Sequence, residues 1–166
     1  MPGRLCACYK CIVSGRSWNL SVADFLTDRS LLAPDGEETE FEKLLQRSDT
    51  LVALLFSSSR SCICESFCEQ LFKTQDSLLR TGHHLHVIYV SSDRSSREML
   101  QFIRKYPNWF SLRFSDQAIR ELQSFLEVHT VPSLVILSST GIVSRTGTKD
   151  ISRLGTRAWD KWVSRS

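Results

Sequence analysis

The sequence predicts an α/β fold with a mixed central sheet flanked by helices, and three observations lead to it. Two continuous apolar runs, residues 51–56 and 85–90, are typical of strands buried on both faces. Each run is followed by a segment of helical periodicity, which predicts parallel strands joined by a right-handed crossover. A hairpin and a last helix near the C-terminus add antiparallel strands to the same sheet.

The region before the first run divides the chain into an extension and a domain. Residues 1–36 are weakly patterned and form an N-terminal extension, with candidate short strands near residues 5–13 and 18–20. A turn at residues 33–36 closes the extension. The domain is expected over residues 37–166, beginning with a helix because Glu37 and Glu38 suit a helix N-terminus. The apolar face of that helix would consist of Phe41, Leu44 and Leu45.

The other elements alternate between helix and strand, each bounded by a turn or a capping residue. They are a helix over about 62–79, one around 99–103, one over 117–127, hairpin strands at 133–137 and 142–145, and a last helix from Gly147. Residues 91–93 are expected to end the second strand and to cap the helix after it. The resulting order, β-α-β-α-α-β-β-α, fits several α/β topologies, so periodicity alone leaves alternatives open.

Composition and charge exclude several classes of function. The 166 residues are 42% hydrophobic and 23% charged, which suits one domain with a full core. The net charge of +3 is small and no basic stripe is interleaved with aromatic residues, so no nucleic-acid partner is expected. The apolar runs are far shorter than the roughly 20 residues that cross a bilayer, so no membrane insertion is expected. The N-terminus lacks a secretory pattern, which predicts a cytoplasmic or nuclear protein.

Six cysteines in two clusters are the unusual feature of the chain. The N-terminal cluster offers only three of the four ligands that zinc needs, and we assign it no role. It consists of Cys6, Cys8 and Cys11. His83, His84 and His86 are further candidate ligands, and alternation along a strand puts His84 and His86 on one face. Because neither spacing completes a metal site, we expect no metal and no other cofactor.

Several segments resemble ordered motifs of one family. Residues 56–67 lie between a buried strand and its helix, where a thioredoxin active site lies. Residues 130–134 contain an X-Pro bond that resembles the cis-Pro loop facing that site in thioredoxins. Residues 87–100 and 107–114 are similar to the insertion of tryparedoxins and nucleoredoxins. Residues 151–162 resemble the C-terminal helix of nucleoredoxin-like proteins, which include the rod-derived cone viability factors. The resemblance implies a thioredoxin-like fold with a tryparedoxin-type insertion.

The active-site motif departs from the catalytic pattern of this family. Redox-active members carry Trp-Cys-Pro-x-Cys where this chain has Arg-Ser-Cys-Ile-Cys at residues 60–64. The alignment through Phe67 puts Ser61 at the attacking position, and only Cys64, at the resolving position, keeps its sulfur. A serine hydroxyl is not ionised near neutral pH and forms no mixed disulfide, so the standard two-cysteine exchange cannot run. The buried acid of thioredoxin corresponds here to Leu55.

Cys62 and Cys64 are the candidate catalytic thiols for a different route. Cys62 lies near a helix N-terminus, where the helix dipole lowers the pKa of a thiol. Cys64 or Cys68 would have to be its partner. However, Cys62 and Cys64 point to different sides of a helix, and a regular helix holds Cys64 and Cys68 poorly for a bond. Cys64 and Cys68 are therefore expected to be small buried residues.

The resemblance implies a nucleoredoxin-like protein with a degenerate active site and weak or lost catalysis. Such a protein would support the maintenance and survival of sensory neurons, including photoreceptors, through protein partners or redox signalling. We expect His129 to be structural and the partner-binding groove to be formed by Arg60, Ser61, an exposed Trp109, Val131 and Pro132. The alternatives are a weak thiol–disulfide oxidoreductase using Cys62 with Cys64 or Cys68, and a structural subunit that uses the fold as a docking platform.

Overall fold

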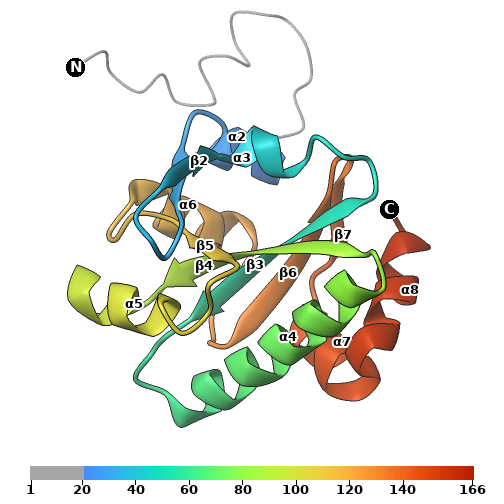
Figure 1. Ribbon diagram of the computed structural model, residues 1–166. Coiled ribbons are helices and arrows are strands. Elements are labelled where there is room, and N and C mark those ends of the chain that lie inside the picture. Colours follow the sequence, from blue (N-terminus) through green and yellow to red (C-terminus); the bar gives the residue numbers. More distant parts are fainter. Residues whose placement is uncertain (1–20) are drawn as a thin grey trace, which may run out of the picture.

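Helices cover both faces of one seven-stranded sheet in the computed structural model, which describes residues 21–166 (Figure 1). The strand order is β2-β1-β5-β4-β3-β6-β7. The strands are β1 (Ser30–Leu32), β2 (Glu38–Glu40), β3 (Thr50–Ser57), β4 (His84–Ser91), β5 (Trp109–Ser111), β6 (Ser133–Ser138) and β7 (Gly141–Ser144). The helices are α2 (Val22–Leu26), α3 (Phe41–Leu44), α4 (Cys62–Arg80), α5 (Ser96–Ile103), α6 (Gln117–Phe125), α7 (Gly147–Leu154), the 3-10 helix η1 (Gly155–Arg157) and α8 (Ala158–Val163).

The central strands confirm the predicted parallel pair. β3 and β4 are paired in parallel from Thr50 opposite His84 to Ser57 opposite Ser91. Because successive strand residues point to opposite faces, β3 contributes side chains to two separate hydrophobic cores. Leu51, Ala53 and Leu55 enter the first core, and Val52, Leu54 and Phe56 enter the second. Burial on both faces explains why this part of the sequence is an unbroken apolar run.

The helices lie in two layers, one over each core. Apolar residues of α4, α5, α7 and α8 line the first core, and those of α2, α3 and α6 line the second. Figure 1 shows α4 and α7 on one side of the sheet, with α8 next to α7. Within residues 21–166, no helix is long and apolar enough to cross a membrane.

The C-terminal hairpin is confirmed, and the last helix is interrupted. β6 is antiparallel to both β3 and β7. The helical segment that begins at Gly147 is divided by Gly155, whose φ of 54° lies in the left-handed region that glycine adopts without steric cost. The segment therefore continues as η1 and α8 instead of as one straight helix.

The N-terminal part of the described chain belongs to the sheet, so the boundary drawn at residue 36 falls inside the domain. β1 is antiparallel to β2, and Leu32 pairs with Ser111 of β5. Leu26 and Leu31 are fully buried in the second core. The helix expected from Glu37 is replaced by β2 and the single turn α3, because the turn at 33–36 folds the chain back onto β1. The candidate strands near 5–13 and 18–20 lie outside the described residues.

The prediction that Trp109 is exposed is wrong. Trp109 begins β5, which lies between β4 and β1 in the interior of the sheet. Its side chain is 0% exposed, its Nε1 donates to Gln75 Oε1 at 2.8 Å, and its ring stacks on Tyr106. An internal strand covered by helices on both sides buries its large side chains, so Trp109 belongs to the first core and not to a groove.

Candidate functional site

Three chain connections meet at one edge of the sheet. β3 and β4 end together, with Ser57 opposite Ser91. Phe56 is opposite Ser133 at the start of β6, so the preceding Val131–Pro132 peptide lies at the same edge. This peptide is cis, as the resemblance implied. Sites in open α/β sheets form at the carboxyl ends of the parallel strands, which is where these connections lie.

The motif at residues 60–64 forms the N-terminus of α4. Ser61 is the N-cap, and its Oγ accepts a hydrogen bond from the backbone N of Cys64 at 3.3 Å. Cys62 is the first helical residue and is exposed. Ile63 next to it is 68% exposed. The Ser61 hydroxyl is therefore used in capping the helix.

The other two described cysteines are closed off from solvent. Cys64 and Cys68 are free thiols with no exposed surface. Burial raises the pKa of Cys68 to about 12, although a contact of 3.6 Å between its Sγ and Ser57 Oγ acts in the opposite direction. A thiol with such a pKa is almost entirely protonated at neutral pH and is a poor nucleophile. The predicted buried positions of Cys64 and Cys68 are confirmed. Cys62 is the accessible thiol among residues 21–166.

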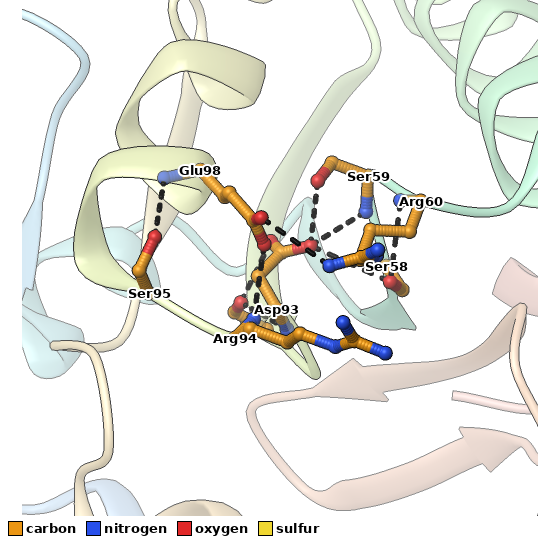
Figure 2. Close-up of polar contacts among 8 residues, drawn as sticks. Ser58, Ser59, Arg60, Asp93, Arg94, Ser95 and Glu98 are labelled. Atoms are coloured by element: carbon orange, nitrogen blue, oxygen red, sulfur yellow. Dashed lines mark hydrogen bonds and ion pairs between the residues drawn. The ribbon is translucent and has the colours of Figure 1, made fainter.

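A buried carboxylate organises this edge of the sheet (Figure 2). Asp93 follows β4 and is 8% exposed. It accepts hydrogen bonds from both sides of the edge. The donors are the Ser58 hydroxyl, the Ser59 backbone N and hydroxyl, the Tyr89 hydroxyl and the Ser91 hydroxyl. Burial and the neighbouring Asp93 carboxylate raise the pKa of Tyr89, so its hydroxyl remains a donor. Sequence reasoning missed this role, although an Asp at the carboxyl end of a buried parallel strand was the available signal.

A second acidic residue ties the motif to α5. Glu98 Oε1 lies 3.5 Å from Arg60 Nη1, and Glu98 Oε2 accepts a hydrogen bond from the Arg94 backbone N at 3.1 Å. The N-cap of α5 is Ser95, whose Oγ accepts from the Glu98 backbone N. The cap expected at residues 91–93 is thus displaced to Ser95. Arg60 is held toward α5 by its contact with Glu98 (Figure 2).

The histidines do not gather at this edge. His84 and His86 lie on one face of β4, where burial and then His84 lower the pKa of His86. His83 stacks on Trp159, with ring centroids 4.8 Å apart. In the described part of the chain, no three His, Cys, Asp or Glu side chains are grouped so that they could hold a metal ion. His129 is exposed next to the Val131–Pro132 peptide. Cys6, Cys8 and Cys11 lie outside the described residues.

A cis-Pro loop beside the N-terminus of the helix that follows a central parallel strand defines a thioredoxin-fold protein. The chain belongs to the thioredoxin-like family, whose model matches residues 49–143. It is 28% identical over 153 residues to nucleoredoxin-like protein 1 of Xenopus laevis, covering 85% of this chain and 71% of the relative. It is 26% identical to nucleoredoxin-like protein 1 of Homo sapiens, covering 85% and 72%. The probable nucleoredoxin 3 of Oryza sativa subsp. japonica is 30% identical, but the match spans only 28% of that longer protein.

Solved structures agree on the fold. Tryparedoxin II from C. fasciculata superposes with a TM-score of 0.73 at 20% identity, covering 82% of this chain and 90% of that one. A thioredoxin from Wuchereria bancrofti superposes with a TM-score of 0.67 at 20% identity, covering 85% and 98%. At these identities the likeness establishes the thioredoxin fold. The activity of this chain has to be argued from its own residues.

Proposed function

We propose that this chain is a nucleoredoxin-like protein that binds protein partners at the α4 edge and does not perform thioredoxin-type disulfide exchange. The proposal rests on the positions that residues 61–64 take in the structure. The attacking position holds a serine that caps α4, the accessible Cys62 lies one residue further on, and Cys64 is buried. Two-cysteine exchange needs an accessible thiolate whose sulfur can reach a second sulfur.

The partner surface consists of the exposed groups around this edge. Arg60, Ser61, Val131 and Pro132 remain in the proposed groove, and Ile63 takes the place given to Trp109. Ile63 and Val131 are exposed apolar residues, and Arg60 supplies a charge at the rim. Exposed apolar side chains with a polar rim are typical of protein interaction sites. A protein segment is therefore the occupant that this surface suits.

The cellular role in the proposal rests on the relatives. Nucleoredoxin-like protein 1 is the relative that this chain covers for most of its length. Together with the resemblance to the rod-derived cone viability factors, this supports a role in the maintenance and survival of sensory neurons such as photoreceptors. We place that role in the cytoplasm or the nucleus, with protein binding or redox signalling as its molecular basis.

A weak oxidoreductase that uses Cys62 is the second candidate, and the exposure of Cys62 favours it. The observations against it concern the partner thiol. Cys64 and Cys68 have no exposed surface, and the pKa of Cys68 is raised to about 12. Cys62 and Cys64 are two residues apart on a helix, so their side chains diverge. A disulfide between them would require the first turn of α4 to open.

Insulin reduction in the presence of dithiothreitol separates the two candidates. We expect the wild-type chain to stay within about twofold of the uncatalysed rate, because no thiol occupies the attacking position. Ser61→Cys should gain activity, since it restores two cysteines separated by two residues at the helix N-terminus. Cys62→Ser should match the wild type. Turnover by the wild type that is lost in Cys62→Ser would replace the binding proposal with the oxidoreductase.

A further inference from the structure

Asp93 is a buried carboxylate that the proposed function leaves without a role. In the described part of the chain no basic side chain forms an ion pair with it. Its hydrogen-bond donors are neutral hydroxyls and one backbone N–H. A buried charge without an opposite charge is costly unless hydrogen bonds compensate it. Five donors converge on this carboxylate, so the surrounding chain is arranged to hold it.

The two oxygens of Asp93 serve two different segments. Oδ1 accepts from the backbone N and Oγ of Ser59, both at 2.7 Å, and more weakly from Ser58 Oγ. Oδ2 accepts from Tyr89 OH at 2.9 Å and from Ser91 Oγ at 2.8 Å. The carboxylate thus joins residues 58–61, here called the serine loop, to the end of β4 (Figure 2). An amide could accept on only one of these sides, because its other end is a donor.

The serine loop leads directly into the thiol-bearing helix, and contacts with that helix lie just before it and at its last residue. Ser57, immediately before the loop, has its Oγ 3.6 Å from Cys68 Sγ. Ser61, the last residue of the loop, accepts from the backbone N of Cys64. Cys64 and Cys68 are fully buried next to these contacts, whereas Cys62 is exposed. A serine loop displaced from Asp93 would release the Ser61 contact, whereas Ser57 is held in β3 by its pairing with Ser91.

We propose that Asp93 is a positioning residue that holds the serine loop at the N-terminus of α4, so that Cys64 is withheld while Cys62 stays accessible. This inference goes beyond the proposed function, because it concerns which thiols the fold exposes and not which partner binds. The Asp93 carboxylate also lies near enough to the Cys68 thiol to raise its pKa further. The charge of Asp93 therefore adds to the effect of burial on the pKa of that thiol.

Native-state alkylation with iodoacetamide, mapped by mass spectrometry, tests the proposal. A Cys62→Ser background removes the exposed thiol, so label on the peptide of residues 61–73 comes only from Cys64 or Cys68. In Asp93→Ala and Asp93→Asn we expect this label to appear about tenfold or more faster, because bonds to a charged acceptor are lost. The excess labelling should be independent of low urea concentrations, since a local opening exposes little surface.

Asp150→Asn is the matched control, because Asp150 is a second buried carboxylate that accepts from a serine and an aromatic donor. In Asp150→Asn, the rate at which Cys64 and Cys68 are alkylated should rise steeply with urea concentration, because these thiols then become accessible only through global unfolding. Ser59→Ala, which removes one donor and keeps the carboxylate, should give a smaller urea-independent increase. If the Asp93 variants follow the same urea dependence as Asp150→Asn, the proposal is overturned. Insulin reduction does not enter this readout, so failure of the proposed function would be seen separately.

Discussion

At the N-terminus of α4, one step along the chain decides whether a side chain caps the helix or meets solvent. Ser61 directs its Oγ to the backbone N of Cys64, and Cys62 is exposed. Ser61 has the extended backbone of an N-cap whereas Cys62 is the first helical residue, so their side chains point in different directions. A thiol at 62 is therefore no substitute for a thiol at 61, even though both lie close to the positive end of the helix.

The Ser61 hydroxyl stabilises the fold by capping α4. Ser61→Ala should lower the free energy of unfolding by about 1 kcal/mol, because the Cys64 N–H loses its acceptor. Ser61→Thr keeps an acceptor and should lose less. Urea unfolding followed by circular dichroism measures both changes.

Ser66→Ala is the control for this substitution, because Ser66 is an exposed position inside the same helix. Alanine has the higher helix propensity, so this variant should stay within about 0.5 kcal/mol of the wild type. Equal losses at 61 and 66 would show that Ser61 does not act as a cap.

Single residues of the site were predictable where their role is local. The burial of Cys68 follows from its position inside one helix, and the cis peptide before Pro132 follows from the family resemblance of residues 130–134. Asp93 was missed because its donors come from residues 58, 59, 89 and 91, which only the paired ends of β3 and β4 bring together. The exposure of Trp109 was predicted wrongly because a single aromatic residue in a weakly patterned segment does not indicate whether it is buried.

At the scale of elements, Asp150 fastens the C-terminal segment to the sheet. It is buried in α7 and accepts from Ser144 of β7 at 2.8 Å and from Trp162 Nε1 of α8 at 2.9 Å. Lys161 of α8 completes the site with an ion pair. Burial alone would raise the pKa of Asp150, but the hydrogen bonds from Lys161, Trp162 and Ser144 outweigh it and lower the pKa.

Asp150→Asn should therefore destabilise the protein in a pH-dependent way. A carboxylate with a lowered folded-state pKa stabilises the fold above its unfolded pKa of about 3.9, and this contribution is lost as pH falls through the folded pKa. We expect a loss of about 2–4 kcal/mol at pH 7, because a buried hydrogen-bonded charge is removed. The difference from wild type should shrink below about pH 4. Urea unfolding at pH 7 and pH 3 measures it.

Asp76→Asn supplies the comparison, since Asp76 pairs with Arg80 on the exposed face of α4. Exposed pairs contribute little, so this variant should change stability by no more than about 0.5 kcal/mol at either pH. If the loss of unfolding free energy in Asp150→Asn were independent of pH, the charge of Asp150 would not be what holds α8 in place.

Whole elements were predictable in proportion to their length. β3, β4 and α4 carry runs or periodic stripes long enough to be distinguished from chance, and the structure confirms them. β1, β2 and β5 have three residues each, too few for a period of two to be visible. These short strands are defined by their neighbours in the sheet. Because β1 and β2 have no recognisable pattern in the sequence, the domain boundary was predicted at residue 36, after β1.

At the scale of the whole molecule, the two cores share the strands that separate them. The second core combines Leu26 and Leu31 from the N-terminal segment with residues of β3, β4 and α6. The first core, on the opposite face, holds Trp109, Trp159 and Trp162. Because β3 and β4 contribute side chains to both faces, we expect loss of packing in one core to destabilise the other core as well.

Leu31→Ala tests whether the N-terminal segment and the domain unfold as one unit. Leu31 is fully buried, so the cavity should lower the free energy of unfolding by about 2–4 kcal/mol. In a Trp18→Phe background, fluorescence reports on the three tryptophans of the first core. Its urea midpoint should fall together with that of circular dichroism, since coincident transitions indicate a single cooperative unit. Leu32→Ala, at a half-buried neighbouring position, should cost less. An unchanged fluorescence midpoint in Leu31→Ala would instead make residues 21–36 a separately unfolding attachment.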